Sequence, residues 1–477
     1  MQHSRRTRRR LLISALAALA AGCAQTPARK QAGRAIVIGA GFAGLSAARA
    51  LRQSGWSVTV LEARNRIGGR VLTDRSVPGH AVDLGPSWLH AGPRNPLKAV
   101  ASSAGIATRV TDYSSVVFST RQDTQRNLYP RSDVLKFAQL FSGTVESALL
   151  WGELDAFAGR TGLAKARKLS VADVFNAAIR RIEAESGPVD PALVAFQRWV
   201  LESNLAAPLE AVGFAALLDE SDTGVGDTLL PDDDRFVLGG MDQLTSLLAL
   251  DLDIRLDDPV RSIAWKPGSV RVDTVSRTHD ADAVVVTLPV GLLAKNAVQF
   301  SPALPDAKLE AARRLPMGLL NKAFLLYPEP FWETNVDFLT FHANPPPLFY
   351  AWLNFMRYTG QPALLGFTAG AMGREVERMT DAELKARLFT RIRAERGLAS
   401  MEPVDIRVSR WASDPWAGGS YSYLGLGASA DDRTVLAAPV KQTLFFAGEA
   451  THRDDPSSVH GAWWSGLRAA RELLGEV

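Results

Sequence analysis

The sequence predicts an α/β fold divided into two or three domains. A chain of 477 residues is too long for one hydrophobic core. Within residues 35–62, a strand pattern, a glycine-rich turn, a helix pattern and a second strand pattern follow one another, which is the order of a parallel β-α-β unit. No repeat of 20–50 residues is visible, so we do not expect a solenoid or a propeller.

The composition is that of a soluble globular protein. Hydrophobic residues make up 47% of the chain and charged residues 22%, which argues against a disordered chain, a collagen-like fibre or a polytopic membrane protein. The net charge is +4, but five of the 54 basic residues are arginines between positions 5 and 10. Without these five, 49 basic residues face 50 acidic ones. We therefore expect no nucleic-acid binding.

Residues 1–23 resemble an export signal. The five arginines precede an apolar stretch, residues 11–22, that is too short to span a bilayer. Residues 7–12 resemble a twin-arginine motif, and residues 19–23 resemble a bacterial lipoprotein cleavage box that ends in Cys23. We expect a periplasmic protein, with a membrane tether through lipidated Cys23 followed by a flexible linker at residues 24–33. The alternative is a plain signal peptide, in which Cys23 has no role.

The β-α-β unit is well delimited. The apolar run at residues 35–38 is typical of a buried parallel strand, and residues 57–61 have a second strand pattern. Between them, residues 45–53 have helical spacing, and Gly55 is placed to end the helix.

The turn between the first strand and the helix has the spacing of a dinucleotide site. Gly39 allows a tight turn, Gly41 lets a pyrophosphate approach the backbone, and Gly44 lets the helix pack against the strand. The N-terminus of the helix offers free N–H groups to phosphates. Glu62, directly after the second strand, can accept hydrogen bonds from ribose hydroxyls. We therefore predict a Rossmann-like dinucleotide-binding domain.

The next segment distinguishes FAD from NAD. Residues 62–70 (EARNRIGGR) resemble the E-A-R-x-R-x-G-G-R segment of flavin-containing amine oxidases, which wraps FAD. Further segments resemble motifs of the same family, with polyamine oxidases as the nearest members; they are residues 83–90, 237–241, 283–289, 321–322, 331–332, 410–423, 446–451 and 458–466.

This resemblance implies FAD as the cofactor and assigns residues to it. The expected FAD contacts are Gly39, Gly41, Phe42, Ala43, Gly44, Glu62, Ala63, Arg64, Gly69, Arg70, Gly85, Pro86, Ser87, Trp88, Val260, Thr287, Trp411, Tyr421, Gly448, Glu449, Ser458 and Val459. The helix after Ser458 is expected to direct its N-terminus at the flavin, where it stabilises negative charge.

The resemblance also implies four catalytic residues: Lys322, Tyr421, His90 and Trp411. Lys322 would be held by water to flavin N5 and assist reoxidation, or it is a surface residue on an edge strand. His90 touches the amine, or it is a structural histidine. Trp411 lines the flavin pocket or fills the core, and the same two alternatives stay open for Trp416.

Two departures from monoamine oxidases are informative. Those enzymes attach FAD to a cysteine, and this chain has Ser420 at that position, so we expect noncovalent FAD. They also hold the amine between two tyrosines. Tyr421 matches one of them and Ser458 the other, which favours polyamine oxidases.

Seven acidic residues lie between Asp219 and Asp234. They form either a solvated loop or an acidic funnel that attracts a polycation. The sequence has no zinc signature and no G-x-S-x-G element, so we expect no metal site and no serine esterase chemistry.

Both domains are expected to be discontinuous. The FAD domain comprises residues 34–95, 225–300 and 405–477, and the α+β substrate domain, a mixed sheet flanked by helices, comprises residues 96–224 and 301–404. Within the substrate domain we predict helices at residues 173–187 and 381–397, and strands at residues 324–327 and 363–367.

The predicted reaction is oxidation of a C–N bond of a polyamine or another primary or secondary amine. Hydride would move to flavin N5, the imine would hydrolyse to an aldehyde, and O2 would reoxidise the flavin to give H2O2. The alternatives are a related flavoenzyme, such as an amino-acid oxidase or a desaturase, and a non-catalytic flavoprotein scaffold. The sequence does not predict the oligomeric state.

Overall fold

The structure is a computed structural model that describes residues 32–90, 95–120, 169–214, 233–342, 347–396 and 401–476. The expected export leader lies outside the described residues, as do nearly all of the linker and residues 219–232 of the acidic stretch. The chain forms two compact units. The first is made from the ranges Met1–Thr111, Asp232–Leu309 and Thr434–Val477, and the second from Asp112–Pro231 and Glu310–Arg433.

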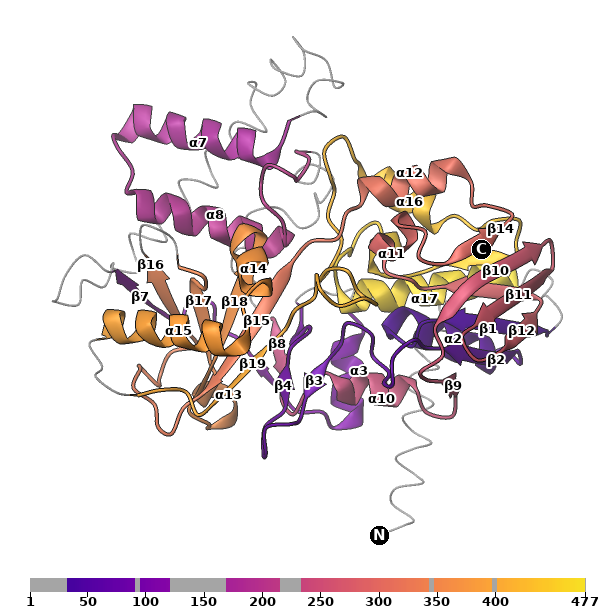
Figure 1. Ribbon diagram of the computed structural model, residues 1–477, viewed down its shortest axis with the longest axis horizontal. Helices are drawn as coiled ribbons and strands as arrows, with labels where there is room; N and C mark the ends of the chain where they lie inside the picture. The colour runs from indigo at the N-terminus through magenta and orange to yellow at the C-terminus, as the bar shows by residue number, and fades with distance from the viewer. Residues whose placement is uncertain are drawn as a thin grey trace. The chain divides into compact units, whose positions relative to one another are not determined.

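A parallel five-stranded sheet is the centre of the first unit (Figure 1). Its order is β20-β13-β1-β2-β9, so the first strand of the chain lies in the middle. The strands are β1 Arg34–Ile38, β2 Ser57–Leu61, β9 Asp253–Arg255, β13 Ala283–Val286 and β20 Leu444–Phe446. Every residue of β13 and β20 is buried, as expected for parallel strands covered on both faces. The predicted α/β fold with a Rossmann-like sheet is confirmed.

Helices α2 (Phe42–Gln53) and α17 (Val459–Leu474) lie side by side in this unit (Figure 1). Leu45 and Leu51 of α2 are fully buried, and each contributes about 1.5–3 kcal/mol through burial of its side chain. The helices approach closely because Gly466 of α17 has no side chain: a Cβ there would overlap the carbonyl oxygen of Ala43. Ser46 Oγ of α2 also donates to the carbonyl of Trp463, 3.0 Å away.

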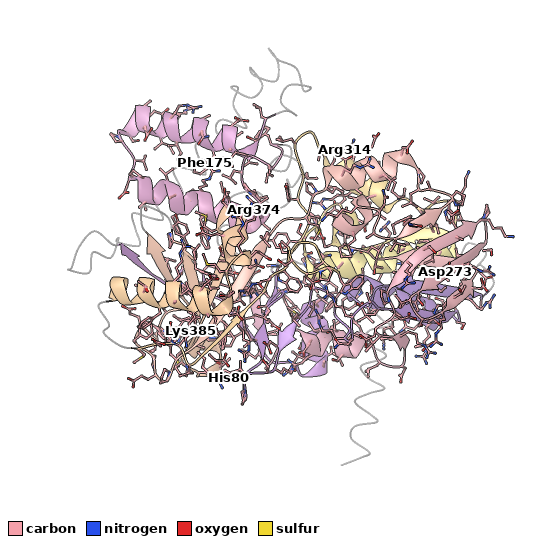
Figure 2. The ribbon with its side chains drawn as sticks, viewed as in Figure 1. His80, Phe175, Asp273, Arg314, Arg374 and Lys385 are labelled. Carbon is pink, nitrogen blue, oxygen red and sulfur yellow. The ribbon has the colours of Figure 1, made fainter. Side chains whose placement is uncertain are left out.

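The remaining elements of the first unit are shorter. A four-stranded sheet has the order β12-β11-β10-β14, a three-stranded sheet the order β5-β8-β6, and β3 pairs with β4. Asp273 of β11 is labelled in Figure 2. The strands are β3 Thr73–Asp74, β4 Val82–Asp83, β5 Trp88–Leu89, β6 Thr108–Val110, β8 Arg235–Val237, β10 Val260–Lys266, β11 Ser269–Thr274, β12 Thr278–Ala281 and β14 Gln299–Ser301. The helices are α3 Leu97–Ala104, α10 Asp242–Leu248, α11 Val290–Ala294 and η1 Glu449–Thr451, with α12 Asp306–Arg314 and α16 Ala430–Ala437 crossing the unit boundaries.

A six-stranded mixed sheet forms the second unit. Its order is β19-β15-β18-β17-β16-β7; β7 is parallel to its neighbour, and the other pairs are antiparallel. The strands are β7 Val116–Thr120, β15 Leu320–Leu326, β16 Phe338–His342, β17 Ala351–Asn354, β18 Ala363–Ala369 and β19 Asp405–Val408. The strands predicted at residues 324–327 and 363–367 are therefore confirmed, as β15 and β18.

Helices pack against this sheet. Residues of α14 (Gly370–Glu377) and α15 (Asp381–Arg396) share an apolar cluster with β15, β17 and β18. The other helices are α7 Val171–Ser186, α8 Pro191–Leu205 and α13 Met356–Thr359. Ser170 starts α7 with a capping box to Asp173, and Phe175, labelled in Figure 2, belongs to its buried face. The predicted helices at 173–187 and 381–397 are confirmed. No helix among the described residues is long and apolar enough to cross a membrane.

Among the described residues, the unit boundaries differ from those expected in three places. Residues 96–111 fall in the first unit, where β6 pairs with β8. Residues 301–309 also belong to the first unit, and residues 405–433 belong to the second. The last difference has a clear cause, because β19 adds to the six-stranded sheet beside β15.

Candidate functional site

The glycine-rich turn has the geometry that its spacing predicts. Gly39 has a φ of +101°, a conformation that residues with a side chain rarely adopt. A Cβ on Gly44 would overlap the carbonyl oxygen of Gly39, so only glycine lets α2 start this close to the strand. At Gly41, by contrast, a Cβ would have only the carbonyl oxygen of Gly68 nearby, at 3.9 Å. The backbone at Gly41 is therefore open on the side where a phosphate would approach.

The first turn of α2 follows directly from Gly41. Phe42 and Ala43 occupy this turn and are buried. No side chain caps the N-terminus of the helix, and the first turn contains no acidic residue. The free N–H groups and the positive end of the helix dipole are thus available to an anion.

Glu62 is buried at the end of β2 and faces the turn. One carboxylate oxygen accepts from the N–H of Ala40 at 2.8 Å, and the other accepts from the N–H of Arg64 at 2.9 Å. An ionised carboxylate has about four acceptor positions, so two remain for ribose hydroxyls. Ala63 and Arg64 continue this loop. The N–H of Asp257 donates to the carbonyl of Arg64, which aligns the segment leading to Val260 with it.

The paired glycines bring a second loop against the turn. The N–H of Gly68 donates to the carbonyl of Ala40 at 2.8 Å, and a Cβ on Gly69 would lie 3.5 Å from the Cα of Gly41. The next residue, Arg70, directs Nη1 to the carboxylate of Glu449 at 2.8 Å. Residues 39–41, 68–70 and 449, distant in sequence, are therefore brought together in one unit.

Thr287 and Gly85 are packed against the same loops. Thr287 Oγ1 donates to the carbonyl of Ile38. A Cβ on Gly39 would lie 2.5 Å from Thr287 Oγ1. A Cβ on Gly85 would overlap the carbonyl oxygen of Arg70.

Helix α17 begins where the sequence predicts. Ser458 is its N-cap, and Ser458 Oγ accepts from the N–H of Gly461 at 3.0 Å. Val459 is the first helical residue. The same helix holds the Glu449 segment, because Ser465 Oγ accepts from the N–H of Gly448 at 2.9 Å. Glu449 in turn accepts from the N–H of Ser457 at 3.1 Å.

Arg468, which the sequence did not single out, holds both ends of the Glu449 segment. Its Nη2 donates to the carbonyl of Phe446 at 2.7 Å and to Thr451 Oγ1 at 3.1 Å. These two residues flank Gly448 and Glu449. Arg468 therefore fixes the segment from the helix side.

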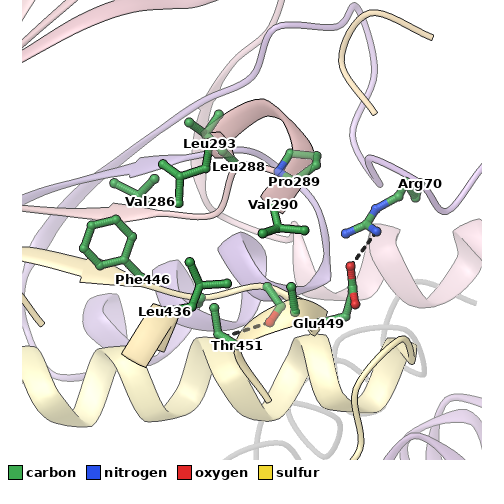
Figure 3. Close-up of a pocket in the computed structure, with 13 residues that line it drawn as sticks. Arg70, Val286, Leu288, Pro289, Val290, Leu293, Leu436, Phe446, Glu449 and Thr451 are labelled. Carbon is green, nitrogen blue, oxygen red and sulfur yellow. Dashed lines mark hydrogen bonds and ion pairs between the residues drawn. The ribbon is translucent and has the colours of Figure 1, made fainter. Parts of the chain in front are cut away.

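A small pocket lies beside this segment (Figure 3). Figure 3 shows the Arg70–Glu449 ion pair at one end and Phe446 at the other. The pocket shares Arg70, Gly448 and Glu449 with the expected cofactor residues, but the glycine turn and Glu62 do not line it. It is a space adjacent to the cofactor residues and does not define the whole cofactor site. The lining residues are Arg70, Val286, Leu288, Pro289, Val290, Leu293, Leu436, Phe446, Ala447, Gly448, Glu449, Ala450 and Thr451.

Residues 86–90 contribute to structure as well as to the expected site. Pro86 precedes Ser87, which is fully buried and accepts at its carbonyl from the N–H of Val237. Trp88 Nε1 donates to Thr111 Oγ1 at 2.8 Å. The His90 side chain is 53% exposed, and its Nδ1 lies 3.0 Å from a carboxylate oxygen of Asp234. Asp234 is 2% exposed, so at this residue the solvated-loop prediction is wrong.

Lys322 lies in the second unit, in the interior of its sheet. Its strand, β15, is flanked by β19 and β18, and only 4% of the residue is exposed. The edge-strand alternative is therefore wrong. Lys322 Nζ is 5.7 Å from the ring centroid of Phe367, its cross-strand neighbour. A buried lysine on an inner strand is uncommon and marks a candidate functional position.

Trp411 is bound to Asn321, the residue before Lys322 in β15, through a network that the sequence did not predict. The N–H of Trp411 donates to Asn321 Oδ1 at 3.1 Å, and Asn321 Nδ2 donates to Glu377 at 2.9 Å. Glu377 also accepts from the N–H groups of Ala412 and Ser413 and from Ser413 Oγ. Asn321 belongs to a motif in the sequence, whereas nothing distinguished Glu377 from the other acids of its helix.

Tyr421 and Ser420 are fixed by backbone contacts. Tyr421 Oη donates to the carbonyl of Ser203 at 2.7 Å, at the C-terminal end of α8. Ser420 Oγ accepts from the N–H of Leu320 at 2.9 Å. Trp416 is 39% exposed, so it does not fill the core. The second unit thus contains Lys322, Trp411 and Tyr421, and the first unit contains the other expected site residues.

A model of the family described as flavin containing amine oxidoreductase matches residues 42–474. The chain belongs to this family. The match covers both units, and it confirms the family that the motifs indicated.

Similar proteins carry amine oxidase names. The chain is 34% identical over 452 residues to Polyamine oxidase 3 of Oryza sativa subsp. japonica, covering 93% of this chain and 89% of that protein. It is 34% identical over 454 residues to Polyamine oxidase 2 of Arabidopsis thaliana, with 93% and 88% covered. A solved structure of a putrescine oxidase A394C mutant has a TM-score of 0.75 at 21% identity, with 93% of this chain and 99% of that chain covered, and it supports the fold alone.

The residues of this flavin-containing amine oxidoreductase fit FAD. The family implies FAD, and the first unit offers an open glycine turn, an uncapped helix N-terminus and a carboxylate with acceptor positions left. Among the described residues, no group of three or more His, Cys, Asp or Glu side chains is arranged to hold a metal ion.

Proposed function

We propose that this flavin-containing amine oxidoreductase is a polyamine-oxidase-like enzyme. It oxidises a C–N bond of a polyamine or another primary or secondary amine, with noncovalently bound FAD and O2 as the acceptor. The observation that carries the cofactor part is the open turn at Gly41 beside the buried carboxylate of Glu62. The substrate class is supported by the 34% identity to two plant proteins named polyamine oxidases.

The first unit supplies the cofactor site. The N-terminus of α2 would face the pyrophosphate, Glu62 would accept from the ribose hydroxyls, and Arg70 with Glu449 orders loops that would surround the cofactor. Bound FAD would supply the redox chemistry, as the acceptor of a hydride from the carbon beside the amine nitrogen and the donor of two electrons to O2, which gives H2O2; the imine would then hydrolyse in water. Ser420 cannot form the thioether that a cysteine would, so the cofactor stays noncovalent.

The second unit supplies Lys322, Trp411 and Tyr421. The buried amine of Lys322 places hydrogen-bond donors in the interior of the sheet, where they would assist reoxidation by O2. Trp411 and Tyr421 provide aromatic surface that desolvates the amine. In the first unit, the exposed His90 is the proposed polar contact of the amine nitrogen.

Retention of FAD tests the cofactor site. Glu62→Ala removes the ribose acceptor and the partner of Ala40 N–H, so the purified variant should lose FAD on gel filtration. Asp280→Asn is a matched control, because Asp280 pairs with Arg271 on an exposed hairpin. A Glu62→Ala protein that keeps its full complement of FAD contradicts the ribose contact.

An H2O2 release assay tests the substrate class. Spermine, spermidine, putrescine, aryl amines and L-amino acids are compared at equal concentration, with kcat/KM as the readout. We expect the highest values among the polyamines. Activity confined to amino acids, or to none of these compounds, contradicts the proposal.

We propose in addition that residues 1–23 direct export and that Cys23 is lipidated. In a bacterial expression host, the full chain should fractionate with membranes, and Cys23→Ser should release it. Equal fractionation of the two proteins contradicts lipidation.

A further inference from the structure

We infer that Asp234 is a positioning residue for His90. Its carboxylate holds the Nδ1–H of the imidazole and so presents Nε2 as the hydrogen-bond acceptor for the substrate nitrogen. This inference rests on the proposed contact between His90 and the amine.

The pair combines a buried acid with an exposed base. The Asp234 side chain is 3% exposed and the His90 side chain 53%, and the distance between Oδ2 and Nδ1 is 3.0 Å. An ionised carboxylate can only accept hydrogen bonds, so Nδ1 must carry the proton. In a neutral imidazole Nε2 then has a free lone pair, because the partner of one ring nitrogen sets the role of the other.

The pairing is built by the backbone. In the three-stranded sheet, Leu89 of β5 pairs with Arg235 of β8, and the next step of this antiparallel register places His90 opposite Asp234. The N–H of Thr111 donates to the carbonyl of Asp234 at 2.9 Å. Asn95 Nδ2 donates to the carbonyl of His90 at 2.9 Å. Backbone and side-chain hydrogen bonds thus hold the main chain at both His90 and Asp234, independently of the contact between their side chains.

A second imidazole lies near His90. The ring centroid of His460 lies 6.5 Å from that of His90, and His460 is the second residue of α17, close to the positive end of the helix dipole. His460 Nε2 is 3.4 Å from Asp455, and His452 Nδ1 is 3.7 Å from the same carboxylate. Burial lowers the pKa of His452.

The neighbouring acid has a different environment. Asp233 is 46% exposed on its side chain and pairs with Lys98 at 2.8 Å and Arg235 at 2.9 Å. Its ion pairs are with these two residues, whereas the ion pair of His90 is with Asp234. Asp233 therefore serves as a matched control, because it is the same residue type at the neighbouring position and does not pair with the His90 imidazole.

The tautomer of His90 has a consequence for amine oxidation. An amine N–H donates a hydrogen bond, so the imidazole nitrogen that meets it must be an acceptor. The opposite tautomer would present an N–H, which can bond only the lone pair of the neutral amine nitrogen, the electron pair that C–N oxidation uses. Loss of one such hydrogen bond corresponds to about a tenfold change in kcat/KM.

The test combines NMR with kinetics. Protein labelled with 15N-histidine is examined by 15N–1H correlation, with and without FAD, at a pH where the imidazoles are neutral. The His90→Gln variant identifies the ring resonances of His90. We expect the Nδ1–H tautomer in wild type and in Asp233→Asn. In Asp234→Asn we expect a population of the Nε2–H tautomer. A thermal melt confirms that each variant is folded.

The kinetic arm uses a double-mutant cycle with spermidine. Asp234→Asn should lower kcat/KM about tenfold in wild type and have no further effect in the His90→Gln background, with FAD affinity unchanged. Unchanged tautomer populations in Asp234→Asn overturn the positioning role, and an equal loss in the His90→Gln background overturns the route through His90. A protein that oxidises no amine but shows the expected tautomers contradicts the proposed function and leaves the Asp234–His90 pairing supported.

Discussion

Arg70 and Glu449 form an ion pair across 379 residues of sequence. Arg70 Nη1 lies 2.8 Å from Glu449 Oε1, and the Glu449 side chain is 5% exposed. The pair joins the loop after β2 to the segment between β20 and α17. Both loops contain residues expected to contact FAD, so the pair orders two parts of one site.

Breaking this pair should weaken cofactor binding. Glu449→Gln leaves Arg70 without its carboxylate, and a charge-assisted hydrogen bond in a buried site corresponds to about a 10–100-fold change in affinity. We expect the Kd for FAD, measured by titration of the FAD-free protein, to rise by this factor. Asp280→Asn, which removes an exposed ion pair, should leave it unchanged. Equal Kd values for Glu449→Gln and wild type contradict the role assigned to the pair.

Glu377 should stabilise the second unit through the loop that contains Trp411. Glu377→Gln keeps the size of the side chain but removes two charge-assisted acceptor positions, so the unfolding midpoint should fall by about 5 °C. Glu375→Gln is the matched control, because Glu375 lies on the same helix and pairs with Arg387 at the surface. If both variants lower the midpoint equally, the network around Asn321 has no special importance.

Lys322 should affect turnover and not cofactor content. Lys322→Met retains the length of the side chain inside the sheet but removes the ammonium, so we expect turnover to fall on the order of 10²-fold. The visible spectrum of the purified variant should still show bound FAD, since none of the FAD-binding residues of the first unit is altered. Lys385→Met removes a more exposed lysine of α15, labelled in Figure 2, and should leave turnover unchanged. Unchanged turnover in Lys322→Met refutes the role of the lysine.

Lys308 should make stability depend on pH. Its Nζ lies 2.7 Å from the carbonyls of Leu436 and Ala438 and 4.0 Å from the ring centroid of Phe446. Burial lowers its pKa to about 7. In the unfolded chain, whose lysine titrates near pH 10.5, this group keeps its proton between pH 7 and 10, while the folded protein has released it. Rising pH therefore stabilises the folded state by up to about 1.4 kcal/mol per pH unit in this range.

The comparison of wild type with Lys308→Met isolates this effect. The difference between their unfolding midpoints should shift in favour of wild type from pH 7 to pH 9 and stay constant below pH 6. Lys266→Met, at an exposed lysine, should show no such trend. A difference that is constant from pH 6 to 9 contradicts the lowered pKa.

The sequence predicted the parts of the fold that local patterns encode. The β1-α2-β2 unit and the strand containing Lys322 follow from apolar runs and glycines that lie within a few positions of one another, whereas the helix start at Ser458 follows from the resemblance to the family. Such signals act over one turn or one strand, so they can be recognised without the fold.

Pairings between distant segments could not be predicted in this way. Asp234 belongs to an acidic run that is typical of a solvated loop, and only the register between β5 and β8 brings it to His90. In the sequence, nothing distinguishes Glu377 from another acidic residue at the end of an amphipathic helix. Its role follows only from the packing of β15 and the Trp411 loop beside it. The assignment of residues 405–433 likewise depends on the pairing of β19 with β15.

Anaerobic reduction tests the central claim most directly. The purified protein is reconstituted with FAD and mixed with spermidine in the absence of O2 while the yellow absorbance is followed. We predict that the absorbance bleaches with spermidine and returns on admission of air with release of H2O2. A protein that remains colourless after reconstitution, or a yellow protein whose absorbance no amine bleaches, would contradict the account.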